Sequence, residues 1–121
     1  MKGDGSSSYS LWHRISFALS GIVQAAKAEK NLQIQLAIAF IVLTLAWILE
    51  ISRTEFFIIL LLIGQVVSLE MVNTALERVV DLVSDEWHAL AKAAKDIAAG
   101  AVLSMSVISA IIGGMIFWPT F

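Results

Sequence analysis

The chain has 121 residues, of which 59% are hydrophobic and only 15% are charged, and its mean hydropathy is +0.85. This balance is typical of an integral membrane protein and not of a soluble domain. The absence of cysteine excludes a disulfide scaffold, a thiolate metal site and thiol catalysis. A net charge of −2 gives no broad basic surface, which argues against a nucleic-acid partner.

The N-terminal part is expected to lie on the membrane and not across it. We expect residues 1–8 to form a disordered tail and residues 9–121 to form one domain. From about 9 to 29, apolar residues recur at helical spacing, and Trp12, Arg14 and Lys27 suit the headgroup region. The pattern predicts an amphipathic surface helix. A cleaved signal peptide fits less well, because the apolar run begins late and no small-residue cleavage site follows it.

Three stretches without charged side chains approach the length of a membrane span, at 32–49, 56–69 and 97–121. About 20 apolar residues cross the hydrocarbon core as a helix. Apolar residues continue past Glu70, so we expect the second span to carry its own acids. The predicted fold class is an all-α membrane protein, with the surface helix followed by transmembrane helices at about 31–50, 55–83 and 96–118.

The basic residues predict the orientation of these spans. Of the eight, only Arg53 falls between the first two spans, and the others precede the first span or lie between the last two. The positive-inside rule then places the N-terminus and the 81–96 loop in the cytoplasm, and the C-terminus outside.

Four polar residues of the second span share one helix face. At about 100° per residue, Glu70, Asn73, Glu77 and Asp81 fall within one narrow sector. An acid inside the membrane costs roughly 2.5 to 3.5 kcal/mol on insertion scales, so it normally has a function or a partner. Oxygen ligands at successive turns suit Mg²⁺, which is held by one or two carboxylates together with substrate phosphates. A further carboxylate beside a lipid hydroxyl would act as general base for phosphoryl transfer.

A simpler interpretation of part of this stripe remains open. Glu77 and Asp81 would mark the water-facing end of the helix, with Arg78 compensating their charge. This interpretation explains Glu70 and Asn73 poorly.

The loop before the third span carries a second polar patch that ends in Lys95 and Asp96. Lys95 is equally suited to pair with a phosphate or to anchor the helix at the interface by snorkelling, and the residues alone leave both open. His88 has no second histidine at ligand spacing and is interpreted as an interfacial residue.

Together these motifs resemble the small prokaryotic lipid kinases, which include the diacylglycerol kinases and the undecaprenol kinases. The resemblance runs from about Gly21 to Leu103. It rests on Glu70-x-x-Asn73-Thr-Ala-x-Glu77-x-x-Val80-Asp81, on Glu86-x-His88 and on Ala-Lys95-Asp96-x-Ala-x-Gly-Ala-Val-Leu103. The chain has neither a P-loop nor the glycine loop of protein kinases, so helix side chains would have to hold the phosphates.

The resemblance implies a homotrimeric kinase of the bacterial cell membrane that uses ATP and Mg²⁺ to phosphorylate diacylglycerol or undecaprenol. It makes Glu70 the base on the lipid hydroxyl, and Glu29 and Glu77 the magnesium carboxylates. The nucleotide- or phosphate-binding positions that it implies are Asn73, Glu77, Asp81, Glu86, Lys95 and Asp96. The family commonly has charged residues where this chain has Gln33 and Gln35, so these two are left out of the site. The 96–103 run looks more like the undecaprenol kinase branch.

Two other classes of function remain as alternatives. A small proton- or cation-coupled transporter subunit would use Glu70 in a proton relay but would need neither Glu29 nor Lys95 nor Asp96. A trimeric membrane scaffold without chemistry would leave the buried acids unexplained.

Overall fold

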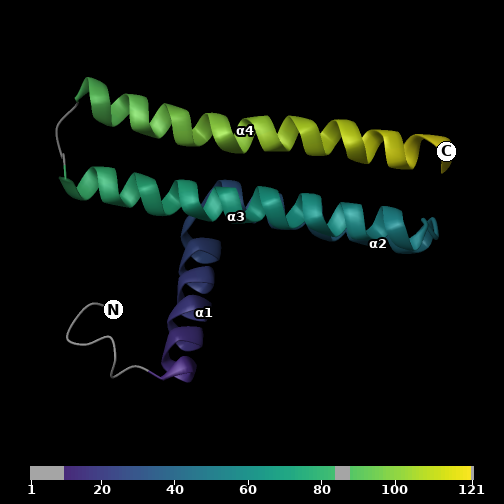
Figure 1. The fold of residues 1–121 in the computed structure, drawn as a ribbon, viewed down its shortest axis with the longest axis horizontal. Coiled ribbons are helices and arrows are strands. Elements are labelled where there is room, and N and C mark those ends of the chain that lie inside the picture. Colours follow the sequence, from purple (N-terminus) through teal and green to yellow (C-terminus); the bar gives the residue numbers. More distant parts are fainter. Residues whose placement is uncertain (1–9, 84–87, 121) are drawn as a thin grey trace.

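The computed structural model describes residues 10–83 and 88–120, and in these ranges all regular secondary structure is helical, with no β-strand. The elements in chain order are α1 (Leu11–Ala28), α2 (Lys30–Ile48), α3 (Arg53–Val83), α4 (Ala89–Phe117) and the short 3-10 helix η2 (Trp118–Thr120) (Figure 1). The all-α fold class is therefore confirmed. The predicted tail at 1–8 and the candidate residue Glu86 lie outside the described residues.

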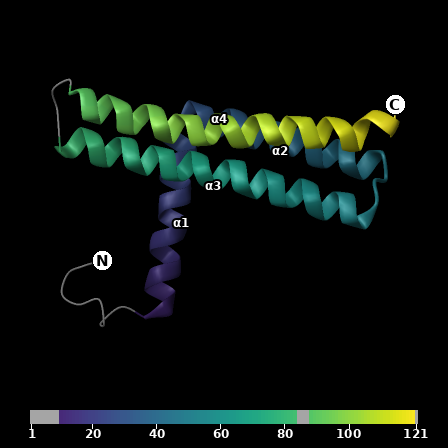
Figure 2. The ribbon, with the colours of Figure 1, turned by 45° about the horizontal axis from the view of Figure 1, so that its top comes forward.

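Helix α3 is the central element of the bundle. Both α2 and α4 pack against it, whereas α2 and α4 do not pack against each other in the described part of the chain. The seam between α2 and α3 is built on a seven-residue repeat, in which Leu32, Ala39 and Ala46 of α2 and Ile59 and Val66 of α3 are buried. Helices α2, α3 and α4 lie roughly parallel or antiparallel, and α1 leaves them crosswise (Figure 2).

Helices α2, α3 and α4 are each long and apolar enough to cross a membrane, as the sequence predicts. Most of their apolar side chains are exposed in the single chain, including Phe40, Leu61 and Met115. Such surfaces are stable against lipid tails or against other membrane helices, and not against water. The structure therefore supports a membrane protein with three spans.

The helix lengths show which part of the bundle extends beyond the hydrocarbon core. At 1.5 Å per residue, α3 with 31 residues is about 46 Å long and α2 with 19 residues about 28 Å, against a core of about 30 Å. The acidic end of α3 and the start of α4 extend past the joint of α1 and α2 (Figure 1). With α1 crosswise at that joint, and only Ala25 of α1 buried, α1 has the geometry of a helix lying on the membrane surface.

Residues 81–83 belong to α3 and residues 89–96 to α4, so the predicted loop over 81–96 is wrong for both of these parts. Helix α4 begins at Ala89 because His88 caps it, with Nδ1 accepting a hydrogen bond from the Leu90 N–H at 3.1 Å. The alanines that follow are strong helix formers, and Lys92 pairs with Asp96 one turn later at 2.6 Å. Lys95 and Asp96 therefore project from a helix.

The turn between α2 and α3 strains one residue. The Glu50 N–H bonds to the Trp47 carbonyl at 3.2 Å, and the Ile51 N–H bonds to the Ala46 carbonyl at 3.3 Å, which is the Schellman pattern. This pattern places Glu50 in the left-handed region, with φ at 53°. Glycine normally occupies this position because a Cβ atom is unfavourable there.

We expect Glu50→Gly to stabilise the protein, because glycine adopts the left-handed conformation without the steric cost. The expected gain is about 1 kcal/mol, or about 4 °C in the midpoint of thermal unfolding in detergent. Glu50→Ala is the matched control, since it removes the carboxylate but keeps the Cβ atom. An equal gain in both variants would show that the charge, and not the backbone, is the source of the strain.

Candidate functional site

Glu70 and Asn73, the first two residues of the acidic stripe of α3, are buried. The exposed fractions of Glu70 and Asn73 are 4% and 8%. The Asn73 side chain hydrogen-bonds to the Glu70 carboxylate, and the carboxylates of Glu77 and Glu29 lie near enough to act on Glu70 electrostatically. We call these four residues the inner cluster. The helical spacing had placed three of them on one face, and the fold brings Glu29, which the family resemblance had implied, to them from the α1–α2 joint.

Asn73 contributes a buried oxygen with unused hydrogen-bonding capacity. Its Oδ1 atom is inaccessible to solvent and has no hydrogen-bond partner among the described residues. A buried acceptor of this kind costs about 1–3 kcal/mol, so native proteins retain few of them. Asn73 Oδ1 is therefore an oxygen atom that is available to bind a cation beside the carboxylates of the inner cluster.

Glu29 is positioned by the joint between the surface helix and the first span. It is the single residue between α1 and α2, and although it is the N-cap of α2, its side chain makes no capping hydrogen bond. One carboxylate oxygen lies 3.9 Å from an Arg78 guanidinium nitrogen on α3. Arg78 thus faces Glu29 across the helix interface, a pairing that no sequence pattern indicated.

A second group joins the ends of α3 and α4. Lys95 Nζ donates a hydrogen bond to Asp81 Oδ1 at 2.6 Å, and Glu77 is near enough to Lys95 to attract it electrostatically. We call Asp81 and Lys95 the outer pair. Glu77 links this pair to the inner cluster, so residues from the α1–α2 joint, α3 and α4 form one continuous polar site.

Asp96 stands apart from these contacts. Its Oδ2 accepts a hydrogen bond from Lys92 Nζ at 2.6 Å on the exposed surface of α4. Lys92 was not singled out from the sequence, although a lysine four residues before an aspartate is a recognisable helix pair. The nucleotide role expected for Asp96 remains a prediction, as does that of Glu86.

The donor set of the inner cluster suits a cation that keeps other ligands. In residues 10–83 and 88–120, no three His, Cys, Asp or Glu side chains are grouped to hold a metal by themselves. Glu29, Glu77 and Asn73 Oδ1 offer oxygen atoms only, which Mg²⁺ prefers, and Mg²⁺ commonly takes one or two carboxylates and completes its shell with phosphates and water. The residues present therefore fit magnesium bound together with a nucleotide.

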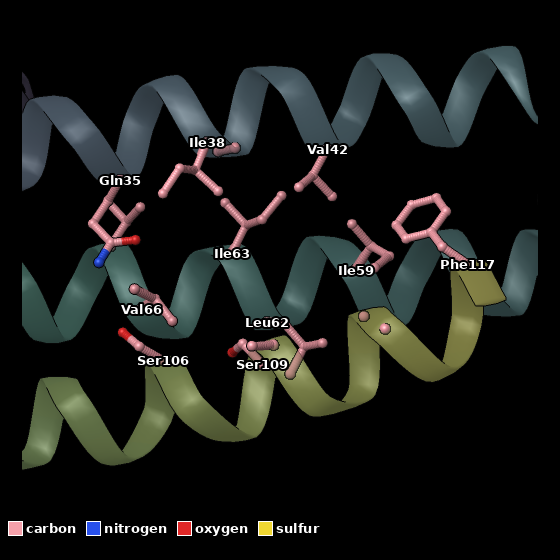
Figure 3. Close-up of a pocket in the computed structure, with 15 residues that line it drawn as sticks. Gln35, Ile38, Val42, Ile59, Leu62, Ile63, Val66, Ser106, Ser109 and Phe117 are labelled. Carbon is pink, nitrogen blue, oxygen red and sulfur yellow. The ribbon is translucent and has the colours of Figure 1, made fainter.

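An apolar groove lies between α2 and α4, where both helices pack on α3 but not on each other. Its volume is about 430 Å³. Gln35, Val66 and Ser106 lie at one end, and Ile59 and Phe117 lie at the other (Figure 3). Val66 is one helical turn, about 6 Å, from Glu70 on the same face of α3. The groove thus continues the face of the inner cluster into the apolar half of the bundle.

Comparison with known proteins shows to which family the chain belongs. The family model of prokaryotic diacylglycerol kinase matches residues 16–117. The chain is 52% identical to an undecaprenol kinase of Bacillus subtilis over 99 residues, which cover 82% of this chain and 80% of the relative. It is 38% identical to a diacylglycerol kinase of Synechocystis over 85% of this chain and 59% of the relative.

A diacylglycerol kinase of Haemophilus influenzae is 28% identical over 84% of this chain and 87% of the relative. The family match includes Glu29, the whole acidic stripe of α3 and the outer pair. On this evidence, the chain belongs to the prokaryotic diacylglycerol kinase family.

Proposed function

We propose that this membrane lipid kinase transfers the γ-phosphoryl group of ATP, with Mg²⁺, to the hydroxyl of undecaprenol. The observation that carries the proposal is the inner cluster, in which a buried carboxylate, an amide and two further carboxylates meet close to Lys95. Membership of the family supports the kinase class. The 52% identity to an undecaprenol kinase, against 38% and 28% to diacylglycerol kinases, supports undecaprenol as the lipid.

Glu70 is proposed as the general base. It is buried, and the Asn73 amide orients its carboxylate, so it would meet a lipid hydroxyl in a site that excludes water. Glu70 would accept the hydroxyl proton while the oxygen attacks the γ-phosphorus and ADP leaves with the electrons of the broken P–O bond. Glu29 acts on Glu70 directly and Lys95 is linked to it through Glu77, which favours this chemistry over a transporter, since a transporter would need neither Glu29 nor Lys95.

Glu29, Glu77 and Asn73 Oδ1 are proposed to hold the magnesium ion. Bound there with ATP, the ion would neutralise charge that develops on the phosphates during transfer. Lys95 would contact the phosphates as a point charge, and Asp81 holds its ammonium group toward α3. Asp96 and Glu86 are assigned to the adenosine or ribose end of the nucleotide.

The apolar groove is proposed to take the chain of the lipid nearest its hydroxyl. Its lining is mostly hydrophobic, and it begins one turn from Glu70, so a lipid whose hydroxyl meets Glu70 would extend directly into it. A prenyl chain has no polar atom beyond its hydroxyl and would bury apolar surface along the whole groove.

The orientation and assembly complete the proposal. ATP is cytoplasmic, so the protruding end of α3, the start of α4 and the N-terminus would face the cytoplasm and the C-terminus would lie outside. A homotrimer would cover apolar surface that the single chain leaves exposed and would shield the acidic stripe.

The role of Lys95 is tested by comparing the loss of Lys95 with the loss of its partner Asp81. Lys95→Met is expected to lower kcat/KM for ATP by about 100-fold, because the site loses a cation on the transferring phosphate. Asp81→Asn removes the partner seen in the structure but leaves the lysine, so a change of less than about threefold is expected for an exposed ion pair. Steady-state kinetics with varied ATP measure both. Equal losses in the two variants would show that the ion pair itself, and not a phosphate contact, matters.

The proposed function is tested by transfer of labelled γ-phosphate from ATP to lipid by the purified protein in mixed micelles. Undecaprenol and diacylglycerol are offered separately and then in competition. Mg²⁺-dependent labelling of undecaprenol, with a higher kcat/KM than for diacylglycerol, is the expected result. Preferential labelling of diacylglycerol would overturn the lipid assignment, and labelling of neither by folded protein would overturn the kinase function for these lipids.

A further inference from the structure

The position of the Glu29 carboxylate depends on a one-residue joint. Helix α1 ends at Ala28 and α2 begins at Lys30, and Glu29 between them is extended, with φ at −104° and ψ at 114°. The two helices run crosswise to each other at this point (Figure 2). A small rotation about these two angles would swing α1 and would carry the Glu29 side chain away from α3.

Gln33, in the first turn of α2, ties this joint together. Its Nε2 atom donates hydrogen bonds to the carbonyl oxygens of Ala26 at 2.9 Å and Lys27 at 3.2 Å. Its backbone N–H donates to the Glu29 carbonyl at 3.1 Å. One residue of α2 therefore holds both the last turn of α1 and the residue between the helices.

These bonds satisfy groups that a helix end leaves open. The last four carbonyls of an α-helix have no partner within the helix. At the end of α1, the Ala25 carbonyl accepts a bond from the Glu29 N–H at 2.9 Å, and the carbonyls of Ala26 and Lys27 accept from Gln33. The Gln33 amide therefore caps α1, while the Glu29 carboxylate caps neither helix and faces Arg78 on α3 instead.

We infer that Gln33 is a positioning residue, whose side-chain amide fixes the α1–α2 joint and thereby holds the Glu29 carboxylate in the inner cluster. The inference rests on the proposed function in one respect, the use of Glu29 as a magnesium ligand. This positioning role requires a hydrogen-bond donor in the side chain at position 33. Glutamine and arginine can both donate to two carbonyls, whereas a glutamate of the same size would place carboxylate oxygens against carbonyl oxygens.

The kinetic arm of the test compares variants at position 33 in the lipid phosphorylation assay. Gln33→Glu is expected to raise the Mg²⁺ concentration for half-maximal activity by about tenfold, as loss of groups that orient metal ligands does. The KM for undecaprenol is expected to stay within about twofold of the wild-type value. Gln33→Arg should restore the magnesium dependence because it restores donors. Gln24→Glu is the matched control, since among the described residues the Gln24 side chain bonds to Ser20 within the exposed face of α1.

The structural arm needs no catalysis. The chain has no cysteine, so Leu19→Cys on α1 and Val79→Cys on α3, both exposed, give a single pair of spin labels. Labelled protein is diluted with unlabelled protein, and the distance distribution is measured by double electron–electron resonance. A narrow distribution is expected in the wild type and with Gln33→Arg, and a broadened or shifted one with Gln33→Glu.

The two arms separate the possible failures. Unchanged distances and unchanged magnesium dependence in Gln33→Glu would overturn the inference. Altered distances with unchanged magnesium dependence would also overturn it, because the joint would then move without consequence for the metal. A wild-type protein that phosphorylates neither lipid would overturn the proposed function, and the distances would still decide whether Gln33 fixes the joint.

Discussion

Glu70→Gln is expected to lower the rate of lipid phosphorylation by about 1,000-fold, within the usual range for removal of a general base. The substitution keeps the size of the side chain and its hydrogen bond with Asn73, but the amide cannot accept the proton of the lipid hydroxyl. It also removes a buried negative charge near Glu77 and Glu29, so the folded state should not be weakened. Transfer of labelled phosphate to undecaprenol in micelles measures the loss.

The control for this prediction makes the same chemical change in the turn that precedes α3. Glu50 lies in the α2–α3 turn, far along the bundle from the inner cluster (Figure 1). Glu50→Gln should retain the wild-type rate. A Glu70→Gln protein with unchanged thermal midpoint and more than about one tenth of the wild-type rate would remove Glu70 from the role of base, because base catalysis contributes at least about 100-fold.

Glu77→Gln is expected to have the second large effect, which is on the Mg²⁺ concentration that the enzyme needs for activity. Replacing a ligand carboxylate should raise the Mg²⁺ concentration for half-maximal activity by at least about tenfold, since even the outer partners of metal sites contribute roughly 10- to 100-fold. Glu77 also attracts Lys95, so kcat should fall as well. Activity is measured over a range of Mg²⁺ at saturating ATP and lipid.

Glu77→Asp distinguishes a metal ligand from a solvent-facing helix end. The shorter carboxylate keeps the charge but moves its oxygens by about one carbon–carbon bond. If Glu77 only marked the water-facing end of α3, both variants would keep the wild-type magnesium dependence. A rightward shift of the magnesium curve in Glu77→Gln, with partial recovery in Glu77→Asp, is the result that a ligand role predicts.

The sequence contains a local signal for the start of α3. Ser52-Arg-Thr-Glu55 is a capping box, in which the Ser52 hydroxyl accepts from the Glu55 N–H and the Glu55 carboxylate accepts from the Ser52 N–H, both at 3.1 Å. It explains why α3 starts at Arg53, immediately after a strained turn. The start of α4 lacks such a signal, because a histidine is not among the usual N-cap residues.

The sequence alone determined the properties that depend on neighbours along the chain. Long apolar runs predict three spans because each backbone hydrogen bond of a helix is made within the run. The spacing of Glu70, Asn73 and Glu77 places them on one face because the helix has a fixed period, and the structure keeps them together.

Tertiary structure decided the contacts between elements, which no local period specifies. The crosswise joint brings Glu29 to α3 and pairs it with Arg78, although 48 residues lie between the two in the sequence. The packing of α4 on α3 pairs Lys95 with Asp81, and the lack of packing between α2 and α4 leaves the apolar groove. The angle between α1 and α2 brings the Gln33 amide to the last carbonyls of α1. No sequence pattern predicts these bonds, because hydrogen bonds across a joint depend on distance in space and not on spacing in the chain.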